Sequence, residues 1–278
     1  MVSQIKLKDI LAYVGQFAPW ELAEPWDNVG LMVGNPDQEA TGVLIALDPT
    51  LQVIEEAILE KANIILTHHP LIFHPLKSIN TATPIGQFLK KALVHDIAVV
   101  SCHTNLDIIS DGVSDALGRA LYLRNTRPLN LTGKRPDQGF GKVGNLPTPM
   151  QGESFIHFVA QRLNLQAMMI AGPQPETVAT IAVCGGSGSD LAEAALQAGA
   201  DIYITAELKH SVARWAEDNG LCVIDAGHFA TENIIIPSLL ARMTAFFAEN
   251  NNPAPVIASQ RQNSPLRFYI AENMHTNT

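Results

Sequence analysis

Short apolar runs alternate with segments of helical periodicity along the first half of the chain. Continuous aliphatic runs at residues 42–48, 63–67 and 97–103 predict strands that are buried on both faces. Between them, residues 49–62 and 81–96 repeat apolar side chains at helical spacing. The order strand, helix, strand, helix, strand favours a largely parallel sheet with helices on its faces.

A second series of the same kind follows a connection that is rich in Gly, Pro, Asn and Thr. This connection, residues 124–151, carries only short strand-like pieces and indicates a boundary between two lobes. After it, helical and strand patterns cover residues 154–164, 177–185, 189–200, 201–205, 207–219, 221–227, 231–250, 255–259 and 266–270. We therefore predict a first lobe of residues 1–126, completed by residues 233–278, and a second lobe of residues 127–232.

The two series resemble each other in sequence. The segment "EAILEKANIILTHH" aligns with "EAALQAGADIYITAE" when one residue is inserted, so one copy ends in His-His and the other in Ala-Glu. Likewise, "AVVSCHTNLD" aligns with "VIDAGHFATE", and both end in His-x-x-x-acid: His103 with Asp107, and His228 with Glu232. Short matches between apolar strands also arise by chance, but the shared ending argues for an internal duplication. Duplication predicts an α/β fold of two similar three-layer lobes, related by a pseudo-twofold axis, with a site between them.

Composition and charge narrow the classes of partner. The 278 residues are 47% hydrophobic and 16% charged, which fits a globular protein with a substantial core. The net charge of −9 argues against nucleic acid as a ligand, including a ring that wraps DNA. No cationic leader precedes an apolar block, and no apolar run reaches the roughly 20 residues of a membrane span. The three cysteines lie in apolar strand-like runs and have no metal-ligand spacing, so we expect reduced thiols in the core of a cytoplasmic protein. We also expect no membrane anchor.

Polar side chains stand at four predicted strand ends. The carboxyl ends of parallel strands meet at one edge of a sheet, where ligands gather. Imidazoles with carboxylates and without a thiolate suit Zn²⁺, Mn²⁺, Fe²⁺ or Ni²⁺. The candidate metal ligands are His68, His69, Asp107, His228 and Glu232. Because adjacent side chains of an extended segment diverge, His68 and His69 suit two ions of a pair, bridged by Glu232 or Asp107.

The other histidines have ordinary interpretations. Loop, helix-end or surface positions explain His74, His95, His157 and His275 better than metal binding does. His210 lies on the predicted helix that follows Glu207, and it faces either the site or solvent.

Two further segments either touch a substrate or form plain turns. The sequence "CGGSGSD", residues 184–190, lies between a predicted strand and a predicted helix. Its backbone N–H groups either bind a phosphate at the start of that helix, or the segment is a flexible turn in which a serine caps the helix. The segment "PWDN" places Trp26, Asp27 and Asn28 either at the edge of a pocket or in a tight turn with a packed Trp.

Four motifs, "PWDNVGLMVG", "THHP", "SCHTNLD" and "DAGHFATE", occur in this order over nearly the whole chain. Together they resemble the NIF-three-like family, whose members are commonly named GTP cyclohydrolase 1 type 2 homologue. The resemblance implies two similar lobes, a dinuclear centre with two divalent ions per chain, and a toroidal homohexamer. The family's ligand pattern falls on the same five residues: His68, His69, Asp107, His228 and Glu232. The short connection between the lobes indicates a form without the inserted middle domain of longer members.

These features favour a metal-dependent hydrolase that acts on a nucleotide or a phosphorylated small molecule. His103 and Glu207 lie outside the family's ligand pattern, and the repeat places them near the site as candidate catalytic groups for proton transfer. The alternative is a non-catalytic metal-binding or metal-handling scaffold with a regulatory role.

Overall fold

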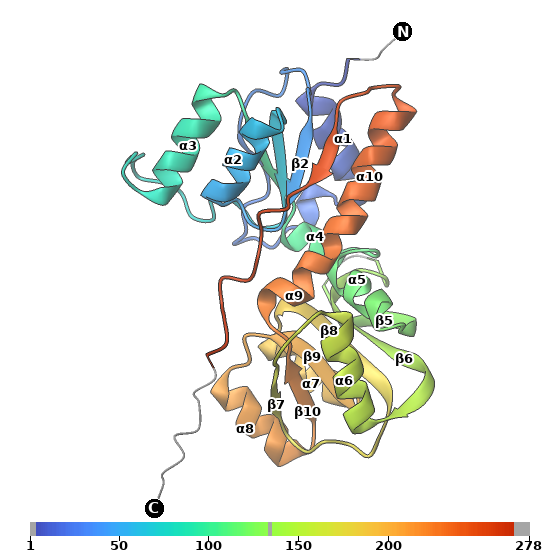
Figure 1. The fold of residues 1–278 in the computed structure, drawn as a ribbon. Coiled ribbons are helices and arrows are strands. Elements are labelled where there is room, and N and C mark those ends of the chain that lie inside the picture. Colours follow the sequence, from blue (N-terminus) through green and yellow to red (C-terminus); the bar gives the residue numbers. More distant parts are fainter. Residues whose placement is uncertain (1–3, 133–134, 270–278) are drawn as a thin grey trace, which may run out of the picture.

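The computed structural model describes residues 4–132 and 135–269, and these form two α/β lobes (Figure 1). The first lobe lies above the second in this view, and short helices connect them. Each lobe is built on one sheet. Among the residues so described, no helix is both long and apolar enough to cross a bilayer.

The sheet of the first lobe has four parallel strands and one antiparallel edge strand. Its order is β1 (Gly30–Val33), β4 (Ala98–Ser101), β3 (Ile64–Thr67), β2 (Val43–Ala46) and β11 (Val256–Ala258). The antiparallel strand is β1, which pairs with β4. The other three pairs are parallel, as the apolar runs predict.

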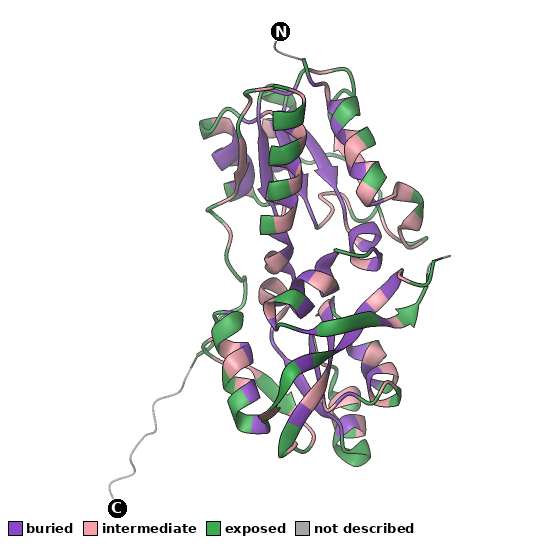
Figure 2. Cartoon of the chain, turned by 90° about the vertical axis from the view of Figure 1, so that its right-hand side faces the viewer, coloured by how far each residue is buried: buried purple, intermediate pink, exposed green. Residues whose placement is uncertain are grey.

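Helices cover both faces of this sheet because successive side chains of each strand point to opposite sides. Val43 and Ile45 of β2 belong to the core under α1 (Leu7–Phe17) and α10 (Ile236–Glu249). Leu44 belongs to the opposite core, under α2 (Leu51–Leu59) and α3 (Pro84–Val94). The result is a three-layer lobe whose central strands β2, β3 and β4 are buried throughout, as Figure 2 shows by colour.

Local chemistry explains where α2 and α3 begin. The hydroxyl of Thr50 accepts a hydrogen bond from the N–H of Val53, and that of Thr83 accepts one from Gly86. Such caps satisfy amides that have no partner within the helix. Pro84 occupies the first turn of α3, where its missing N–H costs nothing.

The sheet of the second lobe has six strands. Its order is β5 (Arg124–Leu131), β6 (Gly139–Gln151), β8 (Thr177–Ser187), β9 (Ile202–Ala206), β10 (Cys222–Asp225) and β7 (Met169–Ala171). One face packs against α5 (Val113–Ala120) and α6 (Gly152–Arg162). The other packs against α7 (Ala192–Gln197) and α8 (His210–Asn219).

The strand orders of the two lobes correspond. β1-β4-β3-β2 in the first lobe matches β7-β10-β9-β8 in the second, and the edge strand is antiparallel in both. A five-residue helix follows the matching strands: α4 (Thr104–Ile108) after β4, and α9 (His228–Glu232) after β10. The predicted α/β fold of two similar lobes is therefore confirmed. The exact boundaries, 1–126 with 233–278 and 127–232, stay a prediction.

Three expectations about individual elements were wrong. The polar connection is a pair of antiparallel strands, β5 and β6, that extends the second sheet. The helix expected over residues 231–250 is interrupted, because a 3-10 turn (Asn233–Ile235) separates α9 from α10. Residues 266–269 form no strand, and the rest of that predicted piece, like His275, lies outside the described residues.

Candidate metal centre

The predicted ligands converge where the two lobes meet. His68 and His69 directly follow β3, and Asp107 lies on α4. From the other lobe, His228 opens α9 and Glu232 ends it. Both short helices lie at the junction of the lobes in Figure 1.

Glu232 is at the middle of this cluster, with its two oxygens turned to different imidazoles. Its Oε2 lies 2.8 Å from the Nε2 atoms of both His69 and His228. Its Oε1 lies 3.8 Å from the Nε2 of His68, which is 3.6 Å from Oδ1 of Asp107. The Nε2 atoms of His69 and His228 are 3.3 Å apart. All five predicted ligands are thus brought together.

Two overlapping groups in the cluster have the spacing of a metal site. One consists of His68, His69 and His103, and the other of His69, His228 and Glu232. Within each group, the potential ligand atoms all lie within 4.8 Å of one another. His103 therefore belongs to the cluster itself, although its position outside the ligand pattern indicates only an assisting role.

Each imidazole is held by its Nδ1 atom. The partners are the carbonyl of Cys102 for His68 at 2.8 Å, Asp48 for His69 at 2.7 Å, Asp27 for His103 at 2.8 Å, and Glu207 for His228 at 2.8 Å. Since each partner is a hydrogen-bond acceptor, Nδ1 carries the proton and donates it. Nε2 then keeps its lone pair for the centre, the arrangement typical of histidines that bind metals.

Two buried atoms of the cluster, Nε2 of His68 and Oε2 of Glu232, make no hydrogen bond of acceptable geometry among the described residues. Oε2 has imidazole nitrogens of His69 and His228 at 2.8 Å, but these contacts are poorly directed for a hydrogen bond. The side chains of His68 and Glu232 are both almost completely buried. An unsatisfied buried polar atom costs about 1–3 kcal/mol. Divalent cations held in the cluster would give both atoms partners, so these residues fit such ions.

The electrostatics of the cluster favour positive charge. Burial raises the pKa of Glu232, but His228, His68 and His69 outweigh it and hold that pKa well below its usual range. Burial lowers the pKa of His69, yet Asp48 and Glu232 raise it to about 10. Burial, reinforced by Glu232, raises the pKa of Asp107 to about 6. Metal-free protein therefore holds protons here that an incoming metal ion must displace.

The family model of Duf34/NIF3 (NGG1p interacting factor 3) matches residues 5–265 of this chain. The chain belongs to the Duf34/NIF3 family. A relative from Clostridium acetobutylicum named "GTP cyclohydrolase 1 type 2 homolog" is 34% identical over 266 residues, which are 95% of this chain and 99% of the relative. A relative of the same name from Streptomyces coelicolor is 38% identical over 232 residues, which are 82% of this chain and 81% of the relative. The resemblance drawn from the four motifs is confirmed.

The fold agrees with solved structures of this family. A Bacillus cereus protein related to NIF3 superposes with a TM-score of 0.91 at 25% identity. The superposition covers 96% of this Duf34/NIF3 chain and 100% of the other. Its match over both lobes supports the two-lobe arrangement in which the cluster is formed.

The Gly-rich segment serves the cluster of this Duf34/NIF3 chain directly. Gly186 has φ +66°, and a Cβ at this position would lie 1.9 Å from Oε1 of Glu232. Its N–H donates to the hydroxyl of Thr231 at 3.0 Å, so this amide already has a partner. The segment therefore makes room for Glu232, and its predicted role as a phosphate cradle stays a prediction.

Glu207 adopts a strained backbone conformation. Its φ of +54° is rare for a residue with a side chain. The hydroxyl of Ser189 donates to its carbonyl at 2.9 Å, and its carboxylate accepts the Nδ1–H of His228. Strain of this kind gathers at functional sites. The contact makes Glu207 a positioning group for His228, and its catalytic role stays a prediction.

Sequence reasoning missed two residues that support the site. Asp48, which holds His69, is the last residue of a predicted strand, so the strand-end rule would have found it. Gln262 accepts hydrogen bonds from the N–H groups of Leu47 and Asp48, both at 2.7 Å. No local sequence pattern indicates that Gln262 supports the site, because its hydrogen-bond partners lie more than 200 residues away in sequence.

The other candidate histidines stay outside the cluster. His157 lies on the exposed face of α6, where its ring contacts the carbonyl of Glu153. His210 is the exposed first residue of α8, His95 ends α3, and His74 packs against Phe73. None of these four belongs to either ligand group among the described residues.

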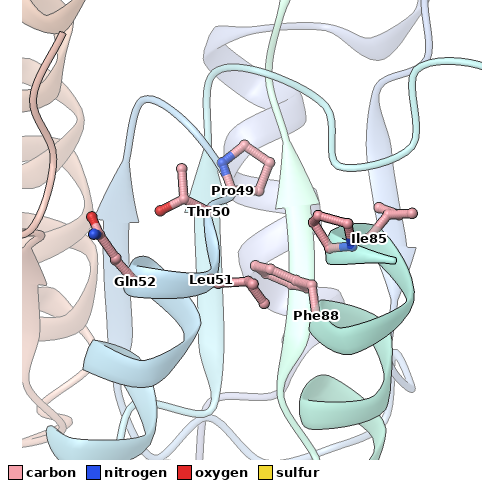
Figure 3. A pocket seen from close by; sticks show the side chains of 7 residues that line it. Pro49, Thr50, Leu51, Gln52, Ile85 and Phe88 are labelled. Atoms are coloured by element: carbon pink, nitrogen blue, oxygen red, sulfur yellow. The ribbon is translucent and has the colours of Figure 1, made fainter. Parts of the chain in front are cut away.

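A hollow of about 520 Å³ lies between the first turns of α2 and α3 (Figure 3). Its lining consists of Pro49, Thr50, Leu51, Gln52, Pro84, Ile85 and Phe88. Pro49 directly follows Asp48, so the hollow adjoins the support of His69. Since no lining residue is an acid, a base or a metal ligand, the reactive groups lie in the cluster instead.

Proposed function

We propose that this protein is a metal-dependent hydrolase with a two-ion centre, acting on a nucleotide or a phosphorylated small molecule. The proposal is carried by the convergence of imidazoles fixed by their Nδ1 atoms on Glu232, where the buried Nε2 of His68 and Oε2 of Glu232 make no well-directed hydrogen bond. The relatives' name, GTP cyclohydrolase 1 type 2 homolog, is compatible with hydrolysis of a nucleotide.

The proposed division of ligands follows the two oxygens of Glu232. On the side of Oε1, His68 and Asp107 would hold one ion. On the side of Oε2, His69 and His228 would hold the other, and Glu232 would contribute to both. His103, which lies close to His68 and His69, would be left for proton transfer. The proposed ions are Zn²⁺, Mn²⁺, Fe²⁺ or Ni²⁺, because the donors are nitrogen and oxygen without sulfur.

A bound pair of divalent ions would supply a water of lowered pKa and neutralise negative charge that develops on the phosphate. The residues of the chain would orient the reactants and move protons. In hydrolysis, the water oxygen bonds to phosphorus, the bond to the leaving oxygen breaks, and that oxygen takes up a proton. We assign the proton transfer to His103, which is partly exposed and oriented by Asp27. Glu207 is the second candidate, through its contact with His228.

We further propose that the protein works as a cytoplasmic homohexamer whose ligands are small molecules. The net charge of −9 supports the absence of a nucleic-acid partner. Light scattering coupled to gel filtration measures the assembly directly. A mass of six chains supports the hexamer, and a monomer or dimer contradicts it.

The experiment for the function starts from protein stripped with a chelator and reloaded with each ion in turn. Release of phosphate is then measured over a panel of nucleotides and phosphorylated sugars. We expect turnover that appears with metal and disappears with chelator. His103→Gln should lower kcat while bound metal stays unchanged, and His157→Gln, an exposed control, should change neither. Two tightly bound ions without turnover on any compound would contradict the hydrolase and support the scaffold.

A further inference from the structure

Two exposed aromatic rings stand beside the proposed metal centre. Trp26 is 58% exposed and Phe73 is 38% exposed. Their ring centroids lie 6.3 Å and 6.2 Å from that of His103. The His103 ring is in turn 5.2 Å from that of His68. The exposed aromatic surface is therefore separated from the metal ligands by a single imidazole.

The turn that carries Trp26 is held rigidly. The carboxylate of the next residue, Asp27, has no exposed surface and accepts hydrogen bonds from His103, from the N–H of Asn28, and from both the N–H and the hydroxyl of Thr104. The hydroxyl of Thr104 also accepts the N–H of Glu24 at 3.0 Å. Trp26 is thus fixed on both sides of the chain, while its own ring stays in solvent.

The loop that carries Phe73 is tied to the same turn. The side-chain amide of Asn28 donates to the carbonyl of Ile72, and the N–H of Ile72 contacts the sulfur of Met32 at 3.4 Å. These contacts bring the Trp26 and Phe73 rings to 5.9 Å at an angle of 59°. Because the rings are tilted and not parallel, Phe73 does not stack flat on the indole.

An exposed tryptophan on a rigid support forgoes the free energy that burial would give it. It can recover this free energy by stacking on a flat ring, a contact that tolerates any base with a π-face. The neighbouring imidazoles and carboxylates make a purely apolar ligand unsuitable. The surface fits a ligand with a flat ring at one end and a metal-binding anion at the other.

We propose that Trp26, with Phe73 beside it, is the stacking platform for a heteroaromatic ring of the substrate, whose phosphate faces the metal centre. This inference rests on the proposed hydrolase function and narrows its substrate class from any phosphorylated small molecule to nucleotides and related ring phosphates. The ring is then recognised by the first lobe alone, and the phosphate by the centre at the junction of the two lobes.

The test compares guanosine 5′-monophosphate with ribose 5-phosphate, which keeps the phosphate and sugar but lacks the ring. With the full-length metal-loaded protein, Trp26→Leu should raise KM for the nucleotide about tenfold or more, the size of one stacking contact, and leave kcat within about twofold. Its KM for ribose 5-phosphate should not change. Trp26→Phe should retain most of the nucleotide preference. Tyr122→Leu removes an exposed aromatic that follows α5 and contacts Phe158, and it should alter the kinetics of neither substrate.

The outcomes separate this inference from the proposed function. If both phosphates are hydrolysed equally well and Trp26→Leu changes neither, the platform is overturned while the hydrolase stands. If nothing is hydrolysed, equilibrium dialysis of the nucleotide decides between the outcomes. A Kd about tenfold higher for Trp26→Leu than for the unchanged protein supports the platform, and an equal Kd overturns it. A change in assembly mass for Trp26→Leu would make Trp26 a contact between copies and would also overturn the platform.

Discussion

The ends of β3 and β9 occupy equivalent positions in the two lobes and carry opposite chemistry. In the first lobe, Thr67 is followed by His68 and His69, whose imidazoles enter the cluster. In the second, Thr205 is followed by Ala206 and Glu207, whose carboxylate holds an imidazole from behind. One lobe therefore presents ligands where the other presents a support for a ligand. Two similar backbones therefore carry side chains with different roles at the equivalent position.

The acidic residues of the two His-x-x-x-acid motifs also differ, in the direction in which their surroundings shift the pKa. Glu232 faces three imidazoles, and these hold its pKa well below the usual range against the effect of burial. Asp107 is buried near Glu232, and these two causes raise its pKa to about 6. Both carboxylates have imidazoles nearby, but only Glu232 has them within hydrogen-bond distance, whereas those near Asp107 act at longer range and do not outweigh burial. Direct contact with the imidazoles, and not the motif, therefore sets the pKa.

The largest effect should come from closing the space beside Glu232. In Gly186→Ala the new Cβ meets Oε1 of Glu232, and we expect loss of bound metal together with destabilisation. Gly199→Ala is the matched control, because Gly199 has a similar φ of +78° but nothing within 4 Å. The control should cost only about 1–2 kcal/mol from the left-handed backbone and keep its metal. Elemental analysis and urea unfolding measure both variants. Full metal content in Gly186→Ala would show that Glu232 does not need this space.

A smaller loss of metal affinity should follow when the carboxylate that holds a ligand histidine is changed, and its size should differ between the two lobes. Asp48→Asn removes the charge behind His69, and Glu207→Gln removes the charge behind His228. Losing such a partner typically costs about 10–100-fold in metal affinity. The side chain of Glu207 is 59% exposed and that of Asp48 35%, so water screens Glu207 more. We expect Asp48→Asn to be the more damaging change in a chelator competition assay. The reverse order would show that the exposure of the supporting carboxylate does not set the strength of its effect.

The smallest predicted effect concerns acid stability. Asp27 supports His103 as Glu207 supports His228. Burial raises the pKa of Asp27, but hydrogen bonds from His103 and Thr104 outweigh burial and lower this pKa to about 2. A lowered carboxyl pKa gives stability that is present above pH 3.8 and is lost as the pH falls towards 2. Asp27→Asn should therefore cost on the order of 1–2 kcal/mol at pH 7 and progressively less below pH 4. Urea unfolding of metal-free protein at several pH values measures this difference. A difference that stays constant down to pH 2 would exclude Asp27 ionisation as its origin.

Much of the fold could be predicted because the central strands are short and buried. β2, β3 and β4 lie within three predicted apolar runs, and the parallel order follows from the helices between them. The hidden strands are β5 and β6. Gly139 and Gly141 have positive φ there, and register shifts interrupt both ladders, so no alternating pattern appears.

The candidate ligands could be predicted for a different reason, since strand ends of a parallel sheet share one edge. Their supports could not be predicted in this way. Asp27 and His103 are 76 residues apart in sequence, and Gln262 is 214 residues from Asp48. Pairs that form only through tertiary folding leave no local periodicity to detect. The orientation of each imidazole therefore becomes visible only in three dimensions.

In the proposed centre, Glu232 would bridge two metal ions between the lobes. Elemental analysis of the reloaded protein after gel filtration, compared with Glu232→Gln, tests it most directly. The amide keeps the size of the side chain but lacks the negative charge that faces His68, His69 and His228. We predict two ions per chain in the unchanged protein and fewer than two in a folded Glu232→Gln variant. Two ions retained in that variant would contradict the bridging role, and fewer than two in the unchanged protein would contradict the two-ion centre.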